Sequence, residues 1–320
     1  MVYIRKSCAS IRNMKIYINR TPVIGPWGGG NKTVTVLSSR LQELGHEVVY
    51  KLCEGIDIIF CFDPRPNSAF EWYQHFLDYK IEHGVKIIQR IGDLGTHGKP
   101  ELMVLVGKTV LLSDFLIFPS QWAKDFLGFV QNPNVVIENA PLEEFYNNRD
   151  THIRPLDKVK IVTHHWSTNP KKGFDYYEFL DDYLTNNDTN IEFTYIGRIP
   201  EGLKFKTVNY HEPTGDNDLL SKVIAESDIY LTASEEEAGA NHVLEAMACG
   251  LPVLYHQNGG SIVNYCKDYG IEYESPQSLL KAINKMSQNY EHFKKNALKF
   301  NRTIDDVINE YVEVINNVQF

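Results

Sequence analysis

The sequence predicts an α/β protein of two halves, each built on a parallel, doubly wound sheet. Its 320 residues favour two domains, because a domain typically holds roughly 100–200 residues. Short runs rich in β-branched and aromatic residues alternate with segments of helical apolar spacing, an order typical of parallel sheets. The same alternation starts again after a polar stretch at 147–157, which has the composition of a linker.

The first half begins with a strand, expected at 14–19, which is followed by a glycine-rich turn at 25–30 and a helix at 31–44. Apolar residues recur in this helix at helical spacing, at Val34, Leu37, Leu41 and Leu44. Gly45 stands where a helix C-terminus favours glycine. Further strands are expected at 47–53, 56–60, 86–91, 115–119 and 135–137, helices at 70–82 and 121–129, and variable loops within 63–75 and 92–108. Residues 1–13 are left as a candidate upstream extension.

The second half repeats this rhythm. Strands are expected at 160–163, 191–196, 229–231 and 252–255, helices at 175–184, 218–226 and 241–249, and a loop at 164–172. From about Pro276 the chain is expected to be helical without a break until Asn301. Thr303 can then cap a last helix, whose apolar residues include Val307 and Tyr311.

Composition excludes several classes of protein. The 32 Lys and Arg residues against 41 Asp and Glu give a net charge of −9, which argues against nucleic acid as a partner. The five cysteines form no Cys-x-x-Cys pair, so neither a disulfide framework nor a zinc site is predicted. No stretch approaches the ~18 apolar residues of a membrane span, and no apolar signal segment opens the chain. We therefore expect a cytoplasmic protein. Association with a membrane is left open by the basic N-terminal segment but is not indicated.

The strongest chemical signal lies between Ser234 and Leu254. Glu237 is placed on a loop after a strand, and Glu245 about one turn into the following helix. Small residues at 238–240 leave the helix N-terminus open, so that N–H groups near Asn241 and His242 can face an anion such as a phosphate. Carboxylates beside such an anion site suit the hydroxyl groups of a ribose or a sugar. On charge alone, an acidic run would more often be a solvated surface.

Glu237 and Glu245, separated by seven residues and followed by Ala-Met-Ala-Cys-Gly-Leu-Pro-Val, resemble the E-x7-E signature of retaining glycosyltransferases of family 4. In that family two Rossmann-like domains face each other across a cleft, the GT-B arrangement. Gly28-Gly29-Gly30, with the Gly45-His-Glu-Val turn after the helix, resembles the family's N-terminal glycine loop. The stretch 135–145 resembles the exit from the first domain, and Asn258-Gly-Gly a later family turn.

The stretch 162–173 resembles the loop that offers a basic pair to the donor diphosphate. Lys172 matches the family lysine, whereas the usual arginine is absent and His164, His165 or Lys171 stands nearest. A histidine in that place would supply a positive charge only at suitable pH or with a raised pKa. In the first half, the turn from Arg90 to His97 follows the carboxyl end of a strand, where ligands of open α/β sheets bind.

The resemblance implies a role for each of these residues. Glu237 would hold the hydroxyl groups of the donor sugar and Glu245 the ribose diol. Lys172, a neighbouring basic or imidazole group and the helix-terminal amides would stabilise the leaving diphosphate. Near the reacting sugar, Arg90, Asp93 and His97 remain alternatives. The resulting site comprises the catalytic residues Glu237, Lys172, His97 and Asp93, and the donor-binding residues Glu245, Asn241, His242, His165, Lys171, Gly29 and Gly30.

The same resemblance implies domains at 1–155 for the acceptor and 156–300 for the nucleotide sugar, with a helix at 301–320 that crosses back to the first domain. The implied activity is that of a retaining hexosyltransferase of the EC 2.4 class. It would use a UDP- or GDP-sugar as co-substrate, need no cofactor or metal, and act on a glycan, lipid or small-molecule acceptor. An Asp-x-Asp metal motif after a strand is not found. The alternative is a catalytically degenerate GT-B protein that binds nucleotide sugars.

Overall fold

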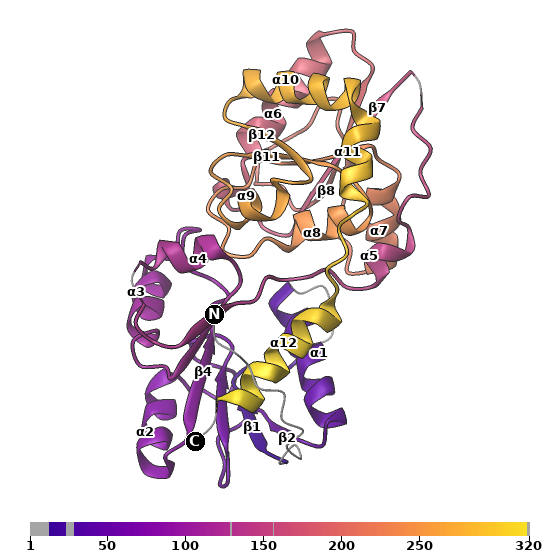
Figure 1. Cartoon of the computed structure of the whole chain (residues 1–320). Helices are drawn as coiled ribbons and strands as arrows, with labels where there is room; N and C mark the ends of the chain where they lie inside the picture. The colour runs from indigo at the N-terminus through magenta and orange to yellow at the C-terminus, as the bar shows by residue number, and fades with distance from the viewer. Residues whose placement is uncertain (1–12, 24–28, 129, 156, 319–320) are drawn as a thin grey trace.

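A computed structural model describes residues 13–23, 29–128, 130–155 and 157–318. It contains two six-stranded parallel sheets, one in each half of the chain, with helices on both faces (Figure 1). The predicted fold class, a GT-B arrangement of two Rossmann-like halves, is confirmed. Residues 1–12 and the glycine-turn residues 25–28 lie outside the described residues.

The first sheet has the strand order β2-β1-β3-β4-β5-β6. Its strands are β1 (Lys15–Ile18), β2 (Glu47–Val49), β3 (Ile58–Cys61), β4 (Lys86–Arg90), β5 (Phe115–Phe118) and β6 (Asn134–Val136). The helices of this half are α1 (Gly29–Glu43), α2 (Tyr73–His83), α3 (Pro100–Thr109) and α4 (Gln121–Phe126). The short helix α5 (Glu144–Asn147) follows β6 in the sequence but packs against the second half (Figure 1). Strand β3 is buried along its whole length, which explains its uninterrupted apolar sequence. The order reverses between β1 and β3, and such reversals form ligand sites at the carboxyl ends of the strands.

The second sheet has the order β12-β11-β10-β7-β8-β9 and reverses between β7 and β10. Its strands are β7 (Val159–His165), β8 (Ile191–Gly197), β9 (Asn209–His211), β10 (Ile229–Thr232), β11 (Val253–His256) and β12 (Gly270–Tyr273). Its helices are the 3₁₀ turn η1 (Pro170–Lys172), α6 (Phe174–Asn186), α7 (Asn217–Ala225), α8 (Asn241–Ala248), α9 (Ser261–Cys266), α10 (Pro276–Gln288) and α11 (Tyr290–Ala297).

The last helix, α12 (Ile304–Asn317), returns to the first half and lies beside α1, as expected (Figure 1). Val307, Ile308, Tyr311 and Ile315 are buried in the same apolar core as β1, β3 and α1. Thr303 caps the helix as predicted, since its side chain accepts a hydrogen bond from the backbone N–H of Asp306. None of the helices in the described ranges is both long and apolar enough to cross a membrane.

The structure corrects several expected elements. Helix α3 occupies much of the stretch 92–108 that was expected to be a loop, and α9, β9 and β12 were not expected. The helical stretch after Pro276 breaks at Asn289, where the backbone leaves helical geometry between α10 and α11. His164 and His165, assigned to a loop from sequence, are the last two residues of β7. They are buried there because β7 is a central strand.

Candidate active site

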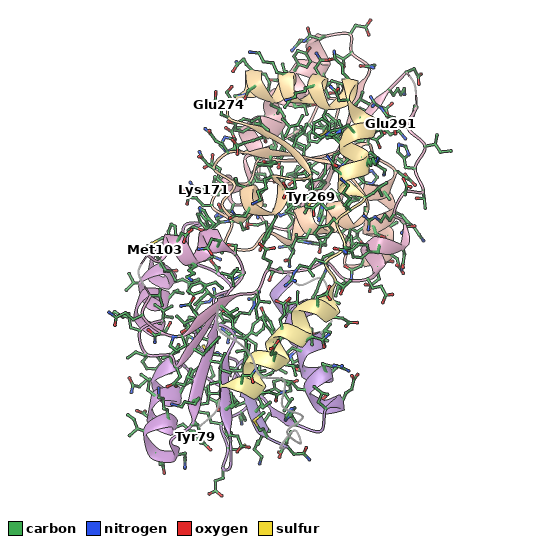
Figure 2. The ribbon with its side chains drawn as sticks, in the orientation of Figure 1. Tyr79, Met103, Lys171, Tyr269, Glu274 and Glu291 are labelled. Atoms are coloured by element: carbon green, nitrogen blue, oxygen red, sulfur yellow. The ribbon has the colours of Figure 1, made fainter. Side chains whose placement is uncertain are left out.

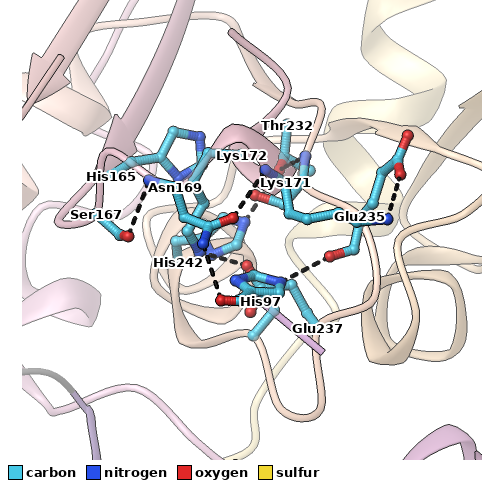
Figure 3. Close-up of polar contacts among 12 residues, drawn as sticks. His97, His165, Ser167, Asn169, Lys171, Lys172, Thr232, Glu235, Glu237 and His242 are labelled. Carbon is cyan, nitrogen blue, oxygen red and sulfur yellow. Dashed lines mark hydrogen bonds and ion pairs between the residues drawn. The ribbon is translucent and has the colours of Figure 1, made fainter. Parts of the chain in front are cut away.

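A cavity of about 700 Å³ lies between the two halves, at the carboxyl ends of strands from both sheets. Most of the residues expected in the site line it: Glu237, Lys172, Asp93, Glu245, Asn241, His242, His165 and Gly30. The second-half residues come from loops at the β7/β10 reversal, because Lys172 follows β7 while Glu237 and α8 follow β10. Two distant sequence segments are thereby brought together on one wall (Figure 3).

The acidic loop 234–240 lies against the turn that precedes α9. The N–H groups of Glu236 and Glu237 donate to the carbonyls of Asn258 and Gly259. Gly260 has φ +69°, and a Cβ added to it would lie 2.6 Å from the carbonyl oxygen of Glu237. The Gly-Gly sequence therefore lets the acidic loop approach this turn closely.

Glu237 forms an ion pair with Lys172 of η1 (Figure 3). Both side chains are largely buried, at 14% and 12% exposed. Burial has the largest single influence and would raise the pKa of Glu237, but the opposing electrostatic and hydrogen-bonding influences, led by the Lys172 ammonium group, together outweigh it and the pKa falls to about 2. Glu237 is therefore an ionised carboxylate at neutral pH, able only to accept hydrogen bonds.

Glu245, a residue of α8, lies inside the cleft, and each of its carboxylate oxygens contacts one partner. Its Oε1 is 3.2 Å from the Nζ of Lys32 on α1, and its Oε2 is 2.9 Å from the Nε2 of His164 on β7. Burial opposes ionisation, yet Lys32 and the hydrogen bond from His164 hold the pKa of Glu245 at about 2. The ion pair with Lys32 joins the two halves across the cleft, and Asn217 also accepts from this lysine at 2.9 Å.

The two histidines beside Lys172 are neutral. Burial, reinforced by Lys172, lowers the pKa of His242 to about 3, and burial lowers that of His165 well below its ordinary value. His242 contacts the Thr232 hydroxyl at 3.0 Å, and His165 contacts the Tyr177 hydroxyl at 2.6 Å. His165, one of the sequence alternatives for the missing arginine, therefore carries no positive charge at neutral pH. The other two alternatives, His164 and Lys171, stay predictions. The rings of His165 and His242 can each offer an N–H or a lone pair, but no positive charge at neutral pH.

The N-terminus of α8 faces the cleft as the small residues before it suggested. Ala240 and Asn241 line the cavity, and the side-chain oxygen of Asn241 is buried with no hydrogen-bond partner in the part of the chain that the structure describes. A buried polar atom without a partner is costly, so a donor group of a bound molecule would be stabilised there. Within the described ranges, no group of three or more His, Cys, Asp or Glu side chains has the geometry of a metal site.

Two expected residues lie outside the cavity lining. Lys171 pairs with Glu235 and Glu236 at 3.3 and 2.8 Å, at the outer margin of the second half (Figure 2). The Nε2 of His97 lies 2.9 Å from the carbonyl oxygen of Glu235, so this nitrogen is the donor and the imidazole is occupied (Figure 3). Gly29 is the first residue of α1, whereas Gly28 falls in the range that is not described.

The contact of His97 belongs to a series that we call the carbonyl clamp. Four first-half side chains donate to backbone carbonyls of the acidic loop: His97 to Glu235, Thr96 to Glu236 at 2.8 Å, Ser120 to Ala238 at 2.7 Å and Asn139 to Gly239 at 3.2 Å. The clamp fixes the loop that bears Glu237 between the two halves.

Sequence reasoning missed Lys32 and two first-half arginines, Arg20 and Arg65, which also line the cleft. A signal for the arginines was present, because they follow the adjacent strands β1 and β3. Lys32 carried no such signal, since a lysine in the first turn of an amphipathic helix is usually solvated.

Residues 167–289, less than half of the chain, match the family model described as Glycosyl transferases group 1. This segment is a glycosyltransferase domain. The enzyme class expected from the sequence, a glycosyltransferase, is confirmed by it. No curated protein sequence matches the chain.

Solved structures of similar fold span nearly the whole chain. Sucrose-phosphate synthase from Thermosynechococcus elongatus has a TM-score of 0.68 at 12% identity, covering 96% of this chain and 99% of its own. Anabaena HepE in complex with UDP and glucose scores 0.66 at 13% identity, with coverages of 96% and 100%. A glycosyltransferase from Rickettsia africae scores 0.66 at 14% identity, with coverages of 94% and 97%. At such identities the likeness shows the fold alone.

Proposed function

We propose that this glycosyltransferase transfers a sugar from a nucleotide-diphosphate sugar to an acceptor hydroxyl, with retention of configuration and without a metal ion, in the manner of family 4. The observation that carries the proposal is the pair of buried, ionised glutamates, Glu237 and Glu245, on either side of the open N-terminus of α8. The similar fold of HepE, whose structure contains UDP and glucose, supports the class of donor.

Glu245 is assigned to the ribose diol. Each of its oxygens has one partner in the structure, and a carboxylate offers about four lone-pair sites. Two hydroxyl groups can therefore be accepted without displacement of Lys32 or His164. Because the pKa is about 2, these hydrogen bonds are made to a charged acceptor, which strengthens them.

The diphosphate is assigned to Lys172 and the N-terminus of α8. Lys172 supplies a formal positive charge on this wall, and the helix terminus adds backbone N–H groups and the positive end of its dipole. The neutral His165 and His242 can donate hydrogen bonds but add no charge. The proposal requires no metal, because these groups stabilise the charge that develops on the leaving group.

The transfer balances without a separate protein base. The acceptor oxygen forms a bond to the anomeric carbon while the bond from that carbon to the diphosphate oxygen breaks, with its electrons remaining on the leaving group. The acceptor proton passes to a phosphate oxygen of the departing nucleoside diphosphate. Glu237, as a carboxylate, orients the sugar hydroxyl groups and stabilises the positive charge that develops on the ring.

The first experiment is thermal unfolding with UDP, GDP, ADP and their sugars, with and without EDTA. A ligand at 100 times its Kd should stabilise the protein by about 2.7 kcal/mol, which is a shift of a few degrees for a chain of this size. Stabilisation by one nucleotide family that persists in EDTA supports the metal-free donor site. If no nucleotide shifts the melting temperature, the assignments of Glu245 and Lys172 are both wrong.

Replacement of Glu237 distinguishes an enzyme from a protein that only binds nucleotide sugars. Glu237→Gln should lower the rate of nucleoside diphosphate release by about 10²–10³-fold, the typical loss for one electrostatic contact to a transition state. Glu236→Gln is the matched control, because Glu236 lies in the same loop but pairs with Lys171 outside the cavity, and it should change the rate less than about twofold. A native protein that binds nucleotide sugars without any turnover would instead support the degenerate alternative.

A further inference from the structure

We propose that the acceptor carries an anionic group, a carboxylate or a phosphate, and that three first-half arginines, Arg20, Arg65 and Arg90, bind it. This inference rests on the proposed function, since it assigns the acceptor of the same transfer. All three residues line the first-half wall of the cleft, opposite the wall that the second half forms.

The arginines stand at the carboxyl ends of three strands that are neighbours in the first sheet. Arg20 follows β1, Arg65 follows β3, and Arg90 is the last residue of β4, in a sheet ordered β2-β1-β3-β4-β5-β6. The sheet reverses between β1 and β3, so this cluster occupies the position where open parallel sheets bind ligands. The second sheet has its own reversal at β7/β10, which the donor site already occupies.

Arg90 is a buried cation, 5% exposed. Its Nε donates to the Tyr311 hydroxyl at 3.0 Å, one terminal nitrogen lies 3.3 Å from the side-chain oxygen of Asn139, and its guanidinium stacks on the Phe62 ring. Among the described residues no carboxylate contacts it. Buried charges are normally paired. The Arg90 guanidinium is held by neutral groups instead, so its charge is left for an anion bound in the cleft.

Gly92 leaves space for the Arg90 guanidinium at the cavity wall. A Cβ added to Gly92 would lie 2.4 Å from the NH1 nitrogen of Arg90, and both residues line the cavity. NH1 has no hydrogen-bond partner within the described part of the chain. The missing side chain at position 92 therefore leaves room for a guanidinium edge at the cavity wall.

Arg20 and Arg65 share a single carboxylate. Arg65 binds Asp63 through Nε at 3.0 Å and NH2 at 2.6 Å, and Arg20 reaches the same carboxylate at 3.2 Å. Despite burial, which would raise it, the pKa of Asp63 is lowered by these arginines. Asp63 is thus ionised and neutralises one of the two guanidinium groups.

The local charges leave an excess of positive charge. Three guanidinium groups and Lys99 face three carboxylates: Asp63, Asp93, which pairs with Lys99 at 2.6 Å, and Glu101, which like Asp93 acts on Arg65. An anionic acceptor would bring the missing counter-charge. The planar fork of arginine suits the two oxygens of a carboxylate or phosphate, and Lys172 with α8 already serves the donor diphosphate on the other wall.

The acceptor preference tests this directly. Nucleoside diphosphate release is measured with the donor sugar that stabilises the protein most, with glucose, glucuronate or glucose 6-phosphate as acceptor. The charged acceptors should give at least a tenfold higher kcat/KM than glucose. Activity with glucuronate alone would indicate a carboxylate as the natural anion, and with glucose 6-phosphate alone a phosphate. Equal use of glucose and its charged analogues would overturn the inference.

Variants separate the cluster from general charge effects. Arg65→Gln should reduce the preference for a charged acceptor over glucose about tenfold. Arg40→Gln is the matched control, because Arg40 on α1 pairs with Glu43 away from the cavity and is equally exposed, at 45% against 44% for Arg65; it should leave the preference unchanged. Arg90→Lys keeps the charge without the fork and should behave like Arg65→Gln. A preference that survives Arg65→Gln and Arg90→Lys contradicts the proposal.

A measurement without an acceptor covers the case in which none of the three sugars is used. Inorganic phosphate or malonate, compared with NaCl of equal ionic strength, should raise the melting temperature of the native protein and of Arg40→Gln more than that of Arg65→Gln, in which the site at Lys172 and α8 remains to bind an anion. No difference between the proteins overturns the anion site even if nucleotide sugars bind. Conversely, a phosphate shift without any response to nucleotide sugars leaves the anion site standing and defeats the proposed function.

Discussion

At the scale of single residues, the cleft is dominated by two ion pairs, Glu237 with Lys172 and Glu245 with Lys32. The sequence predicted Glu237 and Glu245 from one contiguous stretch, and Lys172 from the separate stretch 162–173, because both stretches resemble motifs of the same family. It could not predict Lys32, which lies 213 positions from Glu245 and meets it only when the halves face each other. Contacts of this kind depend on tertiary structure alone.

The buried histidine at position 242 predicts how stability depends on pH. In the unfolded chain a histidine binds its proton near pH 6.5, whereas in the folded protein the pKa of His242 is about 3. Protonation between these values therefore favours the unfolded chain, and the stability present above pH 6.5 is lost as the pH falls. The linkage slope gives a loss on the order of 2 kcal/mol between pH 6.5 and 5 from this residue.

Urea unfolding at several pH values between 7.5 and 5 measures this loss. His242→Asn should flatten the decline in the free energy of unfolding over this range, because the titrating group is removed. Below pH 4.5 a second decline should follow in both proteins, since Glu237 and Glu245 have folded pKa values of about 2 and lose their ion pairs on protonation. An unaltered slope in the His242→Asn variant would show that this imidazole is not held neutral by the fold.

At the scale of elements, most strands and long helices were predicted, because periodicity reports burial on one face. The misses have physical reasons. Helix α3 was expected to be a loop, although Leu102 and Val106 are buried at helical spacing. Apolar residues also lie on its outer face, such as Val104 (58% exposed), and they hide the helical period of the buried ones. Strand β9 is an exposed three-residue edge strand without an apolar pattern. Its existence depends on pairing with β8.

The contact between the acidic loop and Gly260 gives a prediction at this scale. Gly260→Ala places a Cβ 2.6 Å from the carbonyl oxygen of Glu237, so the loop must move away. We expect a fall in melting temperature together with a loss of donor-induced stabilisation. Gly202→Ala is the control: Gly202 has a similar positive φ of +87° but nothing within 4 Å of the added Cβ. It should cost only the backbone strain, about 1 kcal/mol, and leave nucleotide binding unchanged. Equal effects in the two variants would argue against the close approach.

At the scale of the whole molecule, the two-sheet architecture and the returning helix α12 followed from the order of elements and from the family resemblance. The carbonyl clamp between the halves did not follow from the sequence. Its acceptors are backbone carbonyls, which every residue has, so no residue type marks them. The clamp nonetheless decides where Glu237 stands relative to the first half. The geometry between the two halves is thus the part of the site that the sequence predicted least well.

Weakening the clamp should open the molecule. The double variant Thr96→Val with Ser120→Ala removes two hydrogen bonds between the halves, worth about 2 kcal/mol together, and also the N-cap of α4, because the Ser120 hydroxyl accepts from the N–H of Ala123. We expect a larger radius of gyration by small-angle X-ray scattering and a higher KM for the donor. The control pair is Thr185→Val with Ser287→Ala, which lies away from the contact between the halves: the Thr185 hydroxyl donates to the Asp181 carbonyl within α6 and contacts the Thr207 hydroxyl at 3.5 Å, and that of Ser287 has no partner in the described structure. A radius of gyration equal to that of the native protein would show that the clamp does not hold the halves together.

The return of α12 sets the order in which the chain can mature on the ribosome. The first half is translated before the second, but Val307 and Tyr311, which complete its core beside α1, are synthesised only after the second half. Until then the part of the first-half core that α12 covers stays open to water, and such a surface in a nascent chain is exposed to aggregation and to chaperones. The second half has its core residues together and can fold first. The half that is translated first is therefore the one that finishes folding last.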